Sequence, residues 1–251
     1  MSVVVITGAS SGIGAELARQ LGARGERLVL AARREAELTA VARQIGDHAR
    51  PVVTDVTRRE DMDRLRDRAI DAFGAIDVWV NNAGRGISKR VLDLTDGEID
   101  EMITVNLKSA LYGMQAVVPH FIARGRGHLI NVSSFLGRVP MATIRSAYSA
   151  SKAALNSLTA NLRMDLAAEH PGIHVTVVMP PMVATAFADN ALHGTPPPPP
   201  GALAQNVEEV AAAIVRVIDE PAAEIYTAPF LAPIARRYFD DVGAFERAPR
   251  G

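Results

Sequence analysis

The chain alternates short, almost wholly apolar runs with longer amphipathic segments. Strands are expected at Val3–Ile6, Leu28–Ala32, Pro51–Thr54, Val78–Val80, His128–Val132, His174–Met179 and Glu224–Ala228. Helical spacing of apolar residues begins after Gly14 and recurs at Arg34–Ile45, Glu60–Phe73, Ile99–Ala123, Ala147–Glu169 and Val207–Asp219. Apolar strands separated by helices are typical of a parallel sheet covered on both faces. The pattern therefore predicts an α/β fold with one doubly wound parallel sheet.

The regular alternation runs through the whole chain of 251 residues, which predicts one domain, residues 1–251. The rhythm breaks in the region after Pro181, because the five prolines Pro196–Pro200 exclude helix and central strand. We expect residues 184–205 to form either a lid over a substrate or a proline-stiffened linker. The aromatic and basic tail, residues 229–251, could lie in a subunit interface, on a membrane surface or against the domain, and burial against the domain is the favoured interpretation.

Composition narrows the classes of function. Acidic and basic residues interleave to a net charge of −1, so no electrostatic footprint for nucleic acid or anionic lipid is present. The chain has no cysteine, which excludes disulfides and thiolate chemistry and fits a reducing, cytoplasmic location. Its six histidines are scattered without metal-ligand spacing, so no metal is expected. The apolar N-terminal run is too short to span a bilayer. A small-molecule partner is the remaining expectation.

A glycine-rich turn follows the first predicted strand. Its glycines, Gly8, Gly12 and Gly14, have the spacing G-x-x-x-G-x-G rather than the general dinucleotide spacing G-x-G-x-x-G. Glycines let the backbone turn tightly and approach a pyrophosphate, whose charge is received by N–H groups at the start of the next helix. The turn predicts a dinucleotide-binding site, although a purely structural turn is the alternative.

The end of the second predicted strand indicates which dinucleotide is bound. NAD-binding folds commonly place an acid there for the ribose hydroxyl, whereas this chain has Arg33 and Arg34. A guanidinium presents a fork of donors that suits a 2′-phosphate. We therefore expect NADP(H), with NAD(H) less favoured; the alternative is that the two arginines only solvate a helix start.

A third motif supplies candidate proton chemistry. Tyr148 and Lys152 lie four residues apart on a predicted helix, so both side chains share one face. A neighbouring cation favours the phenolate and lowers the pKa of a tyrosine. Ser134, just past a strand end, could donate to a substrate oxygen as charge develops there. Ser133 could be a mere cap, and the two serines could also exchange roles.

Taken together, these motifs resemble the short-chain dehydrogenase/reductase family in its common form of about 250 residues. The resemblance runs from Val3 to about Phe187. It rests on Thr7–Gly14 (Thr-Gly-Ala-Ser-Ser-Gly-Ile-Gly), Asp55-Val56, Asn81–Gly84, Asn106, Asn131–Ser134 and the segment Tyr148-Ser149-Ala150-Ser151-Lys152. It implies a Rossmann-type fold, an oxidoreductase activity and assembly as a homodimer or homotetramer through the two long helices.

The resemblance also implies roles for single residues. Tyr148 would be the catalytic acid or base, Lys152 the ribose anchor and pKa modulator, Ser134 the donor to the substrate oxygen and Asn106 the holder of a proton-relay water. The cofactor-binding residues implied are Gly8, Ser10, Ser11, Gly12, Ile13, Gly14, Arg33, Asp55, Val56, Asn82, Ala83, Gly84, Tyr148, Lys152, Val183 and Thr185.

Three departures from the family pattern stand out. Pro180-Pro181 replaces the usual Pro-Gly, which weakens the assignment of Val183 and Thr185 to the nicotinamide pocket. The separation of Ser134 from Tyr148 is one residue longer than expected, so an insertion within residues 141–146 reshapes one wall of the substrate site. Ser11 stands where many NADP(H)-type members have a basic residue.

The function expected is an NADP(H)-dependent oxidoreductase that interconverts a carbonyl and an alcohol on a small and fairly apolar substrate. One alternative is an inactive NADP(H)-sensing protein, against which the intact Asn106, Ser134, Tyr148 and Lys152 speak. Another is an epimerase or dehydratase that uses the cofactor transiently; it ranks lower because the chain has no large added substrate domain.

Overall fold

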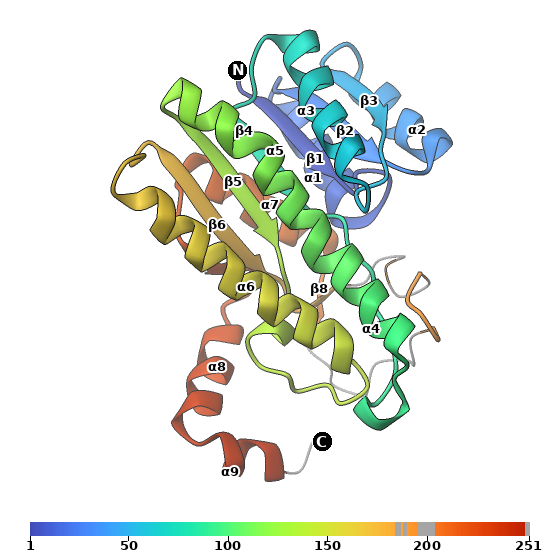
Figure 1. The fold of residues 1–251 in the computed structure, drawn as a ribbon, viewed down its shortest axis with the longest axis vertical. Coiled ribbons are helices and arrows are strands. Elements are labelled where there is room, and N and C mark those ends of the chain that lie inside the picture. Colours follow the sequence, from blue (N-terminus) through green and yellow to red (C-terminus); the bar gives the residue numbers. More distant parts are fainter. Residues whose placement is uncertain (184–186, 188–189, 195–203, 249–251) are drawn as a thin grey trace.

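Parallel strands form the central sheet, in the order β3-β2-β1-β4-β5-β6-β9 (Figure 1). The structure is a computed structural model that describes residues 1–183, 187, 190–194 and 204–248. The strands are β1 Val3–Thr7, β2 Arg27–Ala32, β3 Ala49–Val53, β4 Val78–Asn81, β5 Gly127–Val132, β6 Ile173–Met179 and β9 Glu224–Tyr226. All pairings in this sheet are parallel. The predicted doubly wound α/β fold is confirmed.

Helices cover both faces of the sheet, as the apolar strands require. On one face lie α1 Gly12–Ala23, α2 Glu35–Ile45 and α7 Val207–Asp219, and on the other α3 Arg59–Phe73, α5 Ser109–Arg124 and α6 Ser146–Ala167. Successive side chains of β1 point to opposite faces of the sheet. Val4 and Ile6 pack with Leu17 and Ile214 on one face, whereas Val5 packs with Trp79 on the other. Two hydrophobic cores therefore lie on opposite faces of the sheet, between it and its helices.

The carboxyl ends of the strands gather the sequence motifs at one edge. The glycine turn follows β1, Asn82 follows β4, Ser134 follows β5 and Pro180 follows β6. The chain order reverses between β1 and β4, and such a switch point leaves a crevice where ligands bind in open α/β sheets. The fold thus positions one candidate site beyond these strand ends.

The segment expected as one long helix, residues 99–123, contains three pieces. It begins as α4 Asp96–Ile103, where Thr95 and Glu98 form a capping box, and passes through the π-helical turn Thr104–Lys108 into α5. The π-helical turn contains Asn106, one of the predicted site residues. Apolar spacing does not reveal such a turn, because it changes the hydrogen-bond pattern by one residue only.

The C-terminal tail folds into two helices that were not expected, α8 Leu231–Asp240 and α9 Val242–Arg247 (Figure 1). Leu231 and Ala235 of α8 pack against Phe135 and Val139, which follow β5. The start of the tail is thus packed on the domain, whereas α9 has no buried residue. No helix among the described residues is long and apolar enough to cross a membrane.

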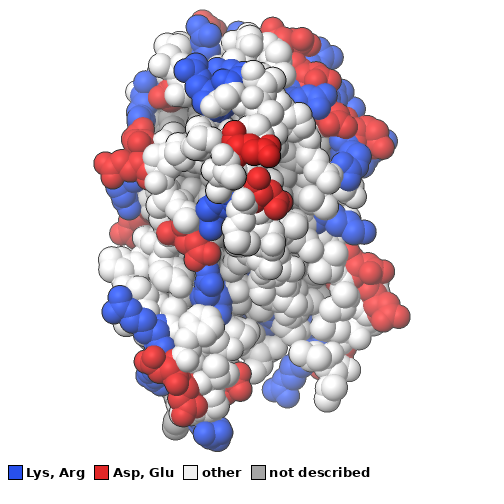
Figure 2. Space-filling model, turned by 60° about the vertical axis from the view of Figure 1, so that its left-hand side comes forward, with Lys and Arg blue, Asp and Glu red and all other residues white. Residues whose placement is uncertain are grey.

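The expected lid segment lies mostly outside the described residues. Its described parts are Phe187, residues 190–194 and the strand β8 Ala204–Gln205, which pairs with β7 Met182–Val183. Leu192 forms a bridge with Ile87. On the surface, both signs of charge are interspersed, as Figure 2 shows for one face of the molecule.

Candidate active site

The glycine turn joins β1 to α1 through two left-handed residues. Gly8 has φ +68° and Gly12 has φ +56°, conformations that side-chain-bearing residues rarely adopt. Ser11, the N-cap of α1, makes no side-chain capping bond among the described residues, and the first turn has no acidic residue. The N–H groups at the start of α1 therefore keep their hydrogen-bonding capacity for an anion. Such a turn could hold the pyrophosphate of a dinucleotide.

Asn82 and Ala83 fasten the loop after β4 to this turn. The Asn82 amide Nδ2 donates to the Thr7 carbonyl at 3.0 Å and to the Gly8 carbonyl at 3.3 Å. In return, the Thr7 hydroxyl oxygen accepts from the backbone N–H groups of Asn82 and Ala83 at 3.0 and 3.1 Å. A Cβ on Gly14 would lie 2.5 Å from the Gly8 carbonyl oxygen, so the helix starts in direct contact with the turn. These contacts make the two loops one unit.

The basic pair after β2 lies beside the same turn. Arg34 Nη2 donates to the hydroxyl oxygens of Ser10 and Ser11 at 3.1 and 2.7 Å. Arg33, the residue selected from the sequence, is exposed. A guanidinium and two hydroxyls thus converge at the end of β2, where a dinucleotide places its adenosine ribose. The sequence pattern predicts Arg33 as the phosphate-binding residue, whereas the Arg34 side chain makes the contacts to the turn.

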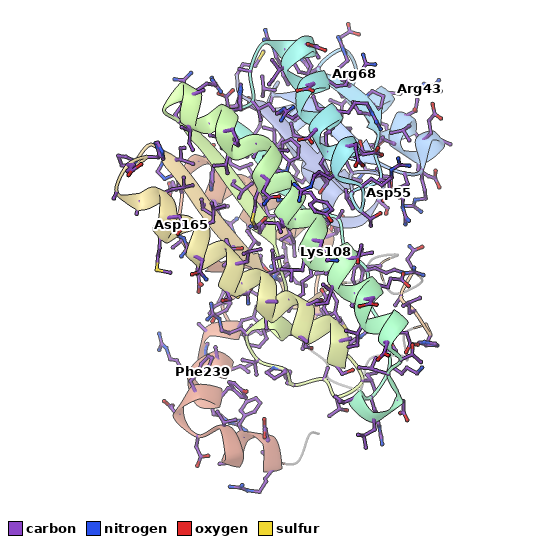
Figure 3. The ribbon with its side chains drawn as sticks, viewed as in Figure 1. Arg43, Asp55, Arg68, Lys108, Asp165 and Phe239 are labelled. Carbon is purple, nitrogen blue, oxygen red and sulfur yellow. The ribbon has the colours of Figure 1, made fainter. Side chains whose placement is uncertain are left out.

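Asp55 and Val56 follow β3 in the neighbouring loop. The Asp55 carboxylate accepts from the Thr57 N–H at 3.0 Å and from the Thr57 hydroxyl at 2.7 Å. Its own N–H donates to the Asp61 carboxylate at 2.9 Å. Figure 3 labels Asp55, which lies in the loop after β3. Val56 is partly buried and packs against the core, so it can form one wall for an adenine ring.

Tyr148 lies in the first turn of α6 beside Ser134. Burial is the main influence on the Tyr148 phenol and raises its pKa, while a side-chain hydrogen bond with Ser134 and the charge of Arg145 act in the opposite direction. The lower pKa of Tyr148 that the sequence predicts is therefore outweighed by the effect of burial, and the phenol carries its proton at neutral pH. Ser133 is turned away, since its hydroxyl donates to the Lys152 carbonyl at 3.2 Å. Of the two serines, Ser134 is the one placed at the phenol.

Lys152 is almost fully buried, at 3% exposure, one helical turn beyond Tyr148. Its Nζ donates to the Val132 carbonyl at 2.9 Å and lies 5.9 Å from the centroid of the Tyr148 ring. Burial lowers the pKa of Lys152 to about 8. A Cβ on Gly84 would lie 3.5 Å from this Nζ, so Gly84 leaves the ammonium open to the loop after β4. The ammonium could reach ribose hydroxyls in that space.

Asn106 sits in the π-helical turn with 1% of its surface exposed. Its Oδ1 accepts from the Arg85 N–H, and its Nδ2 donates to the Arg85 carbonyl, both at 2.9 Å. Nδ2 also donates to the Ser151 hydroxyl at 3.2 Å. The side chain therefore connects the loop after β4 with α6, the helix that carries Tyr148 and Lys152.

Two further side chains lie at the site: Phe187, which the sequence places in the candidate lid without a role of its own, and Arg145, which no sequence motif singles out. The Phe187 ring lies edge-on to the Tyr148 ring, with centroids 5.8 Å apart. A Cβ on Gly86 would lie 3.0 Å from Phe187 Cε1 and 3.1 Å from Arg145 Nη1. The sequence signals were weak: Phe187 stands at the border of the apolar segment, and Arg145 falls within the expected insertion.

The remaining predictions concern the nicotinamide side. Val183 is partly buried and packs against the core that includes β1 and α1. Thr185 lies outside the described residues. Within the part of the chain that the structure describes, no group of three or more His, Asp or Glu side chains is placed to hold a metal ion.

Comparison with known proteins identifies the family. A family model described as short chain dehydrogenase matches residues 2–195, well over half of the chain. The chain belongs to the short chain dehydrogenase family. A curated relative, the uncharacterized oxidoreductase SERP2049 of Staphylococcus epidermidis, is 38% identical over 192 residues, which cover 76% of this chain and 82% of the relative.

Solved structures of short chain dehydrogenases share the fold. An enzyme from Burkholderia phymatum in complex with NAD is 26% identical, with a TM-score of 0.88, and the match covers 100% of this chain and 96% of the other. One from Sphingobium yanoikuyae in complex with NADPH is 28% identical, with a TM-score of 0.83, covering 100% and 97%. As a short chain dehydrogenase, this protein is an oxidoreductase of a family whose solved members include NAD and NADP complexes.

Proposed function

We propose that this short chain dehydrogenase interconverts a carbonyl and an alcohol with NADP(H), and that Tyr148 is its proton donor and acceptor. The observation that carries the proposal is the placement of Tyr148 between Ser134 and Lys152 at the carboxyl edge of the sheet. A bound nicotinamide supplies or accepts the hydride. The protein's part is to hold the substrate oxygen and to move one proton to or from it.

In the reductive direction, Ser134 and Tyr148 receive the substrate oxygen. As the carbonyl carbon gains hydride, negative charge develops on that oxygen, and the Ser134 hydroxyl can donate to it. The Tyr148 phenol then gives up its proton, which its raised pKa keeps in place until that charge develops. Oxidation of the alcohol runs through the same groups in reverse.

Lys152 and Asn106 prepare the site for this proton transfer. The Lys152 ammonium lies near the phenol and stabilises the phenolate that remains after the transfer. Asn106 holds the Arg85 backbone and the Ser151 hydroxyl. We propose that this connection keeps the loop after β4 beside Lys152 and positions a water through which the phenolate regains its proton.

The preference for NADP(H) rests on the charges after β2. No carboxylate stands at Ala31-Ala32-Arg33-Arg34, where NAD binding commonly uses one. Arg34 already contacts the two serine hydroxyls of the turn, and exposed Arg33 precedes it. A 2′-phosphate placed there would meet one or two guanidinium groups and two hydroxyl donors.

Turnover of NADPH with a panel of ketones and aldehydes tests the proposal. We expect oxidation of NADPH at 340 nm together with alcohol formation, and a loss of about 10²-fold to 10⁴-fold in kcat for Tyr148→Phe. NADPH binding, followed by its fluorescence, is expected to change little in this variant. Product formed without net change in NADPH would instead indicate an epimerase or dehydratase. Binding of NADPH without turnover of any substrate would indicate a sensor.

We further propose that the protein assembles as a homodimer or homotetramer through α5 and α6. Both helices present exposed apolar side chains, Ile122 on α5 at 39% and Met164 on α6 at 66%. Light scattering of the purified protein measures the assembly, and a monomer at micromolar concentration would contradict it.

A further inference from the structure

Residues 190–194, called the docked segment below, follow β7 and are bound to the loop after β4 by hydrogen bonds. The Leu192 N–H donates to the Gly86 carbonyl at 2.9 Å, and the Ser88 N–H donates to the Leu192 carbonyl at 3.0 Å. A parallel β-bridge at Leu192 belongs to the same pairing. The Ser88 hydroxyl also donates to the Gly194 carbonyl at 2.6 Å. Two segments that are far apart in the sequence are therefore held side by side.

This pairing places the docked segment beside the candidate proton donor. Leu192 and Tyr148 both pack against one small cluster of buried apolar side chains. The cluster consists of Ile87, Met102 and Ala147. Ala191 is buried, and a Cβ on Gly86 would lie 3.4 Å from the Ala191 Cβ. The docked segment and the loop after β4 thus form one continuous wall next to Tyr148.

The Glu98 carboxylate, which α4 supplies, connects the two halves of this wall. It forms an ion pair with Lys89 of the loop after β4 at 2.9 Å, and it also pairs with His193 of the docked segment. The Glu98 side chain is only 14% exposed. Hydrogen bonds from the Thr95 N–H, and then from Lys89 and His193, lower the pKa of Glu98 to about 2. The carboxylate is therefore charged at neutral pH and is shared between two basic side chains.

His193 makes this contact from a backbone conformation that is uncommon for residues with a side chain. Its φ is +61°, the one positive φ of a non-glycine residue in the described part of the chain, and Gly194 follows with φ +69°. Residues in the left-handed region persist where the surrounding structure holds them. The His193 ring reaches Glu98 from this turn. The turn and the side-chain contact therefore support each other.

Lys89 extends the connection to the helix that carries Tyr148. The Lys89 N–H donates to the Ile144 carbonyl at 2.6 Å, and the Lys89 carbonyl accepts from the Ser146 hydroxyl at 2.7 Å. The ammonium of the same residue donates to both oxygens of Glu98, at 2.9 and 3.0 Å. One carboxylate is thus linked to the docked segment on one side and to the start of α6 on the other.

We propose that Glu98 is a positioning residue, which sets the substrate affinity of this enzyme by holding the docked segment on the loop after β4. The inference rests on the proposed carbonyl–alcohol activity. A wall that is already in place needs no ordering when the substrate binds, whereas a loosened wall must be ordered first, and this ordering lowers the affinity. Loss of the Glu98 contacts is therefore expected to raise KM. The hydride and proton transfers keep their rate once the substrate is bound.

Steady-state kinetics of two variants test this role, with cyclohexanone, benzaldehyde and the most rapidly reduced compound of the carbonyl panel as probes. Glu98→Gln removes the charge and keeps an oxygen for the Thr95 N–H, since a capping box accepts either residue type. His193→Asn keeps a residue that tolerates positive φ and loses the imidazole that contacts Glu98. We expect each variant to raise KM about 5-fold and to change kcat less than about 2-fold. Asp96→Asn, which removes an exposed acid from the same helical turn, is the control for net charge.

A double-mutant cycle and hydrogen exchange distinguish this role from a general effect on stability. Because His193 acts through Glu98, the double variant is expected to raise KM no more than Glu98→Gln alone. Amide exchange in residues 86–89 and in the docked segment is expected to be faster in both variants, since these residues form the hydrogen bonds of the pairing. NADPH binding, followed by its fluorescence, is expected to change little and shows that each variant is folded.

An unchanged KM in Glu98→Gln, with the probes still reduced, overturns the role of Glu98 and leaves the proposed function intact. Additive increases in KM in the double variant also overturn it, because the two residues would then act separately. A fall in kcat at constant KM does the same, since Glu98 would then act on the chemistry at Tyr148. If the wild-type protein reduces no carbonyl compound of the panel, the proposed function itself is contradicted. The exchange rates of the docked segment then decide alone whether Glu98 holds it.

Discussion

The Asn106 side chain forms a closed pair of hydrogen bonds with the backbone of Arg85. Oδ1 accepts from the Arg85 N–H and Nδ2 donates to its carbonyl, both at 2.9 Å, with the amide 1% exposed. This pair joins the loop after β4 to the π-helical turn. Because the amide accepts at its oxygen and donates at its nitrogen, it matches both backbone groups of Arg85, which an ionised carboxylate cannot do.

Replacing the amide by a carboxylate tests that dependence. In Asn106→Asp the second oxygen would face the Arg85 carbonyl, leaving buried acceptors without a donor unless the acid takes up a proton. We expect a loss of about 2 kcal/mol in the free energy of unfolding at neutral pH, measured by urea denaturation, and a lower kcat. The control is Asn161→Asp on exposed α6 surface, where the amide donates to the Ser157 carbonyl. Equal losses in both variants would contradict a special role for Asn106.

The arginines after β2 give a prediction about cofactor choice. Arg34 contacts Ser10 and Ser11, and Arg33 is exposed beside it. Arg33→Asp and Arg34→Gln are each expected to weaken NADPH binding by about 10-fold to 100-fold while changing NADH binding much less, since charge-assisted bonds contribute about 1.5–3 kcal/mol. Titration calorimetry with both cofactors measures this. Arg43→Asp, on the outer part of α2 (Figure 3), is the control for net charge. Parallel losses for NADPH and NADH would refute the assignment.

The contact between the glycine turn and α1 leads to a third prediction. A Cβ on Gly14 would lie 2.5 Å from the Gly8 carbonyl oxygen and 2.6 Å from Asn82 Nδ2, so Gly14→Ala must push the turn and the loop apart. Overpacking of this kind costs about 1–3 kcal/mol, and we expect weaker binding of either cofactor as well. Gly97→Ala is a matched control in α4, because its Cβ would meet no described atom within 4 Å. That variant should gain up to about 1 kcal/mol from helix propensity. Thermal unfolding distinguishes the two.

Much of this fold follows from local sequence patterns. Apolar runs such as Val3–Ile6 identify strands because both faces of the sheet are covered, and the glycines after β1 identify the turn. Tyr148 and Lys152 were singled out because Ser134 and the glycine turn accompany them and the whole set resembles one family, since their helical spacing alone is equally typical of a solvated helix face. The π-helical turn at Asn106 occupies only five residues within a long helical segment, so apolar spacing did not predict it. Arg145 was missed, and Phe187 was assigned only to the candidate lid, because the two meet at Gly86, far from both in the sequence, and only the tertiary structure brings the three together.

A buried histidine at the amino end of β5 predicts how the free energy of unfolding falls at acidic pH. His128 on β5 is 4% exposed, and its Nε2 lies 2.8 Å from the Thr176 hydroxyl oxygen. That hydroxyl donates to the Ala222 carbonyl at 2.6 Å, so Nε2 must be the donor to it. Nδ1 is left without a hydrogen-bond partner among the described residues. Burial, and secondly the charge of His174, lower the pKa of His128 to about 4.

The direction in which pH changes the stability follows from the pKa of His128 in the folded and unfolded states. The unfolded chain binds a proton at His128 near the ordinary pKa of about 6.5, whereas the folded protein does so only near pH 4. Between these values the unfolded state holds more protons, so stability is lost as the pH falls, by about 3 kcal/mol in total for this group. His128→Gln keeps a donor for Thr176 and removes the titration, so its urea midpoint should decline less between pH 6.5 and 4 than that of the wild-type protein. His48→Gln, at an exposed position, is the control. If the wild-type and His128→Gln proteins lose stability in parallel over this range, the acid limit arises elsewhere.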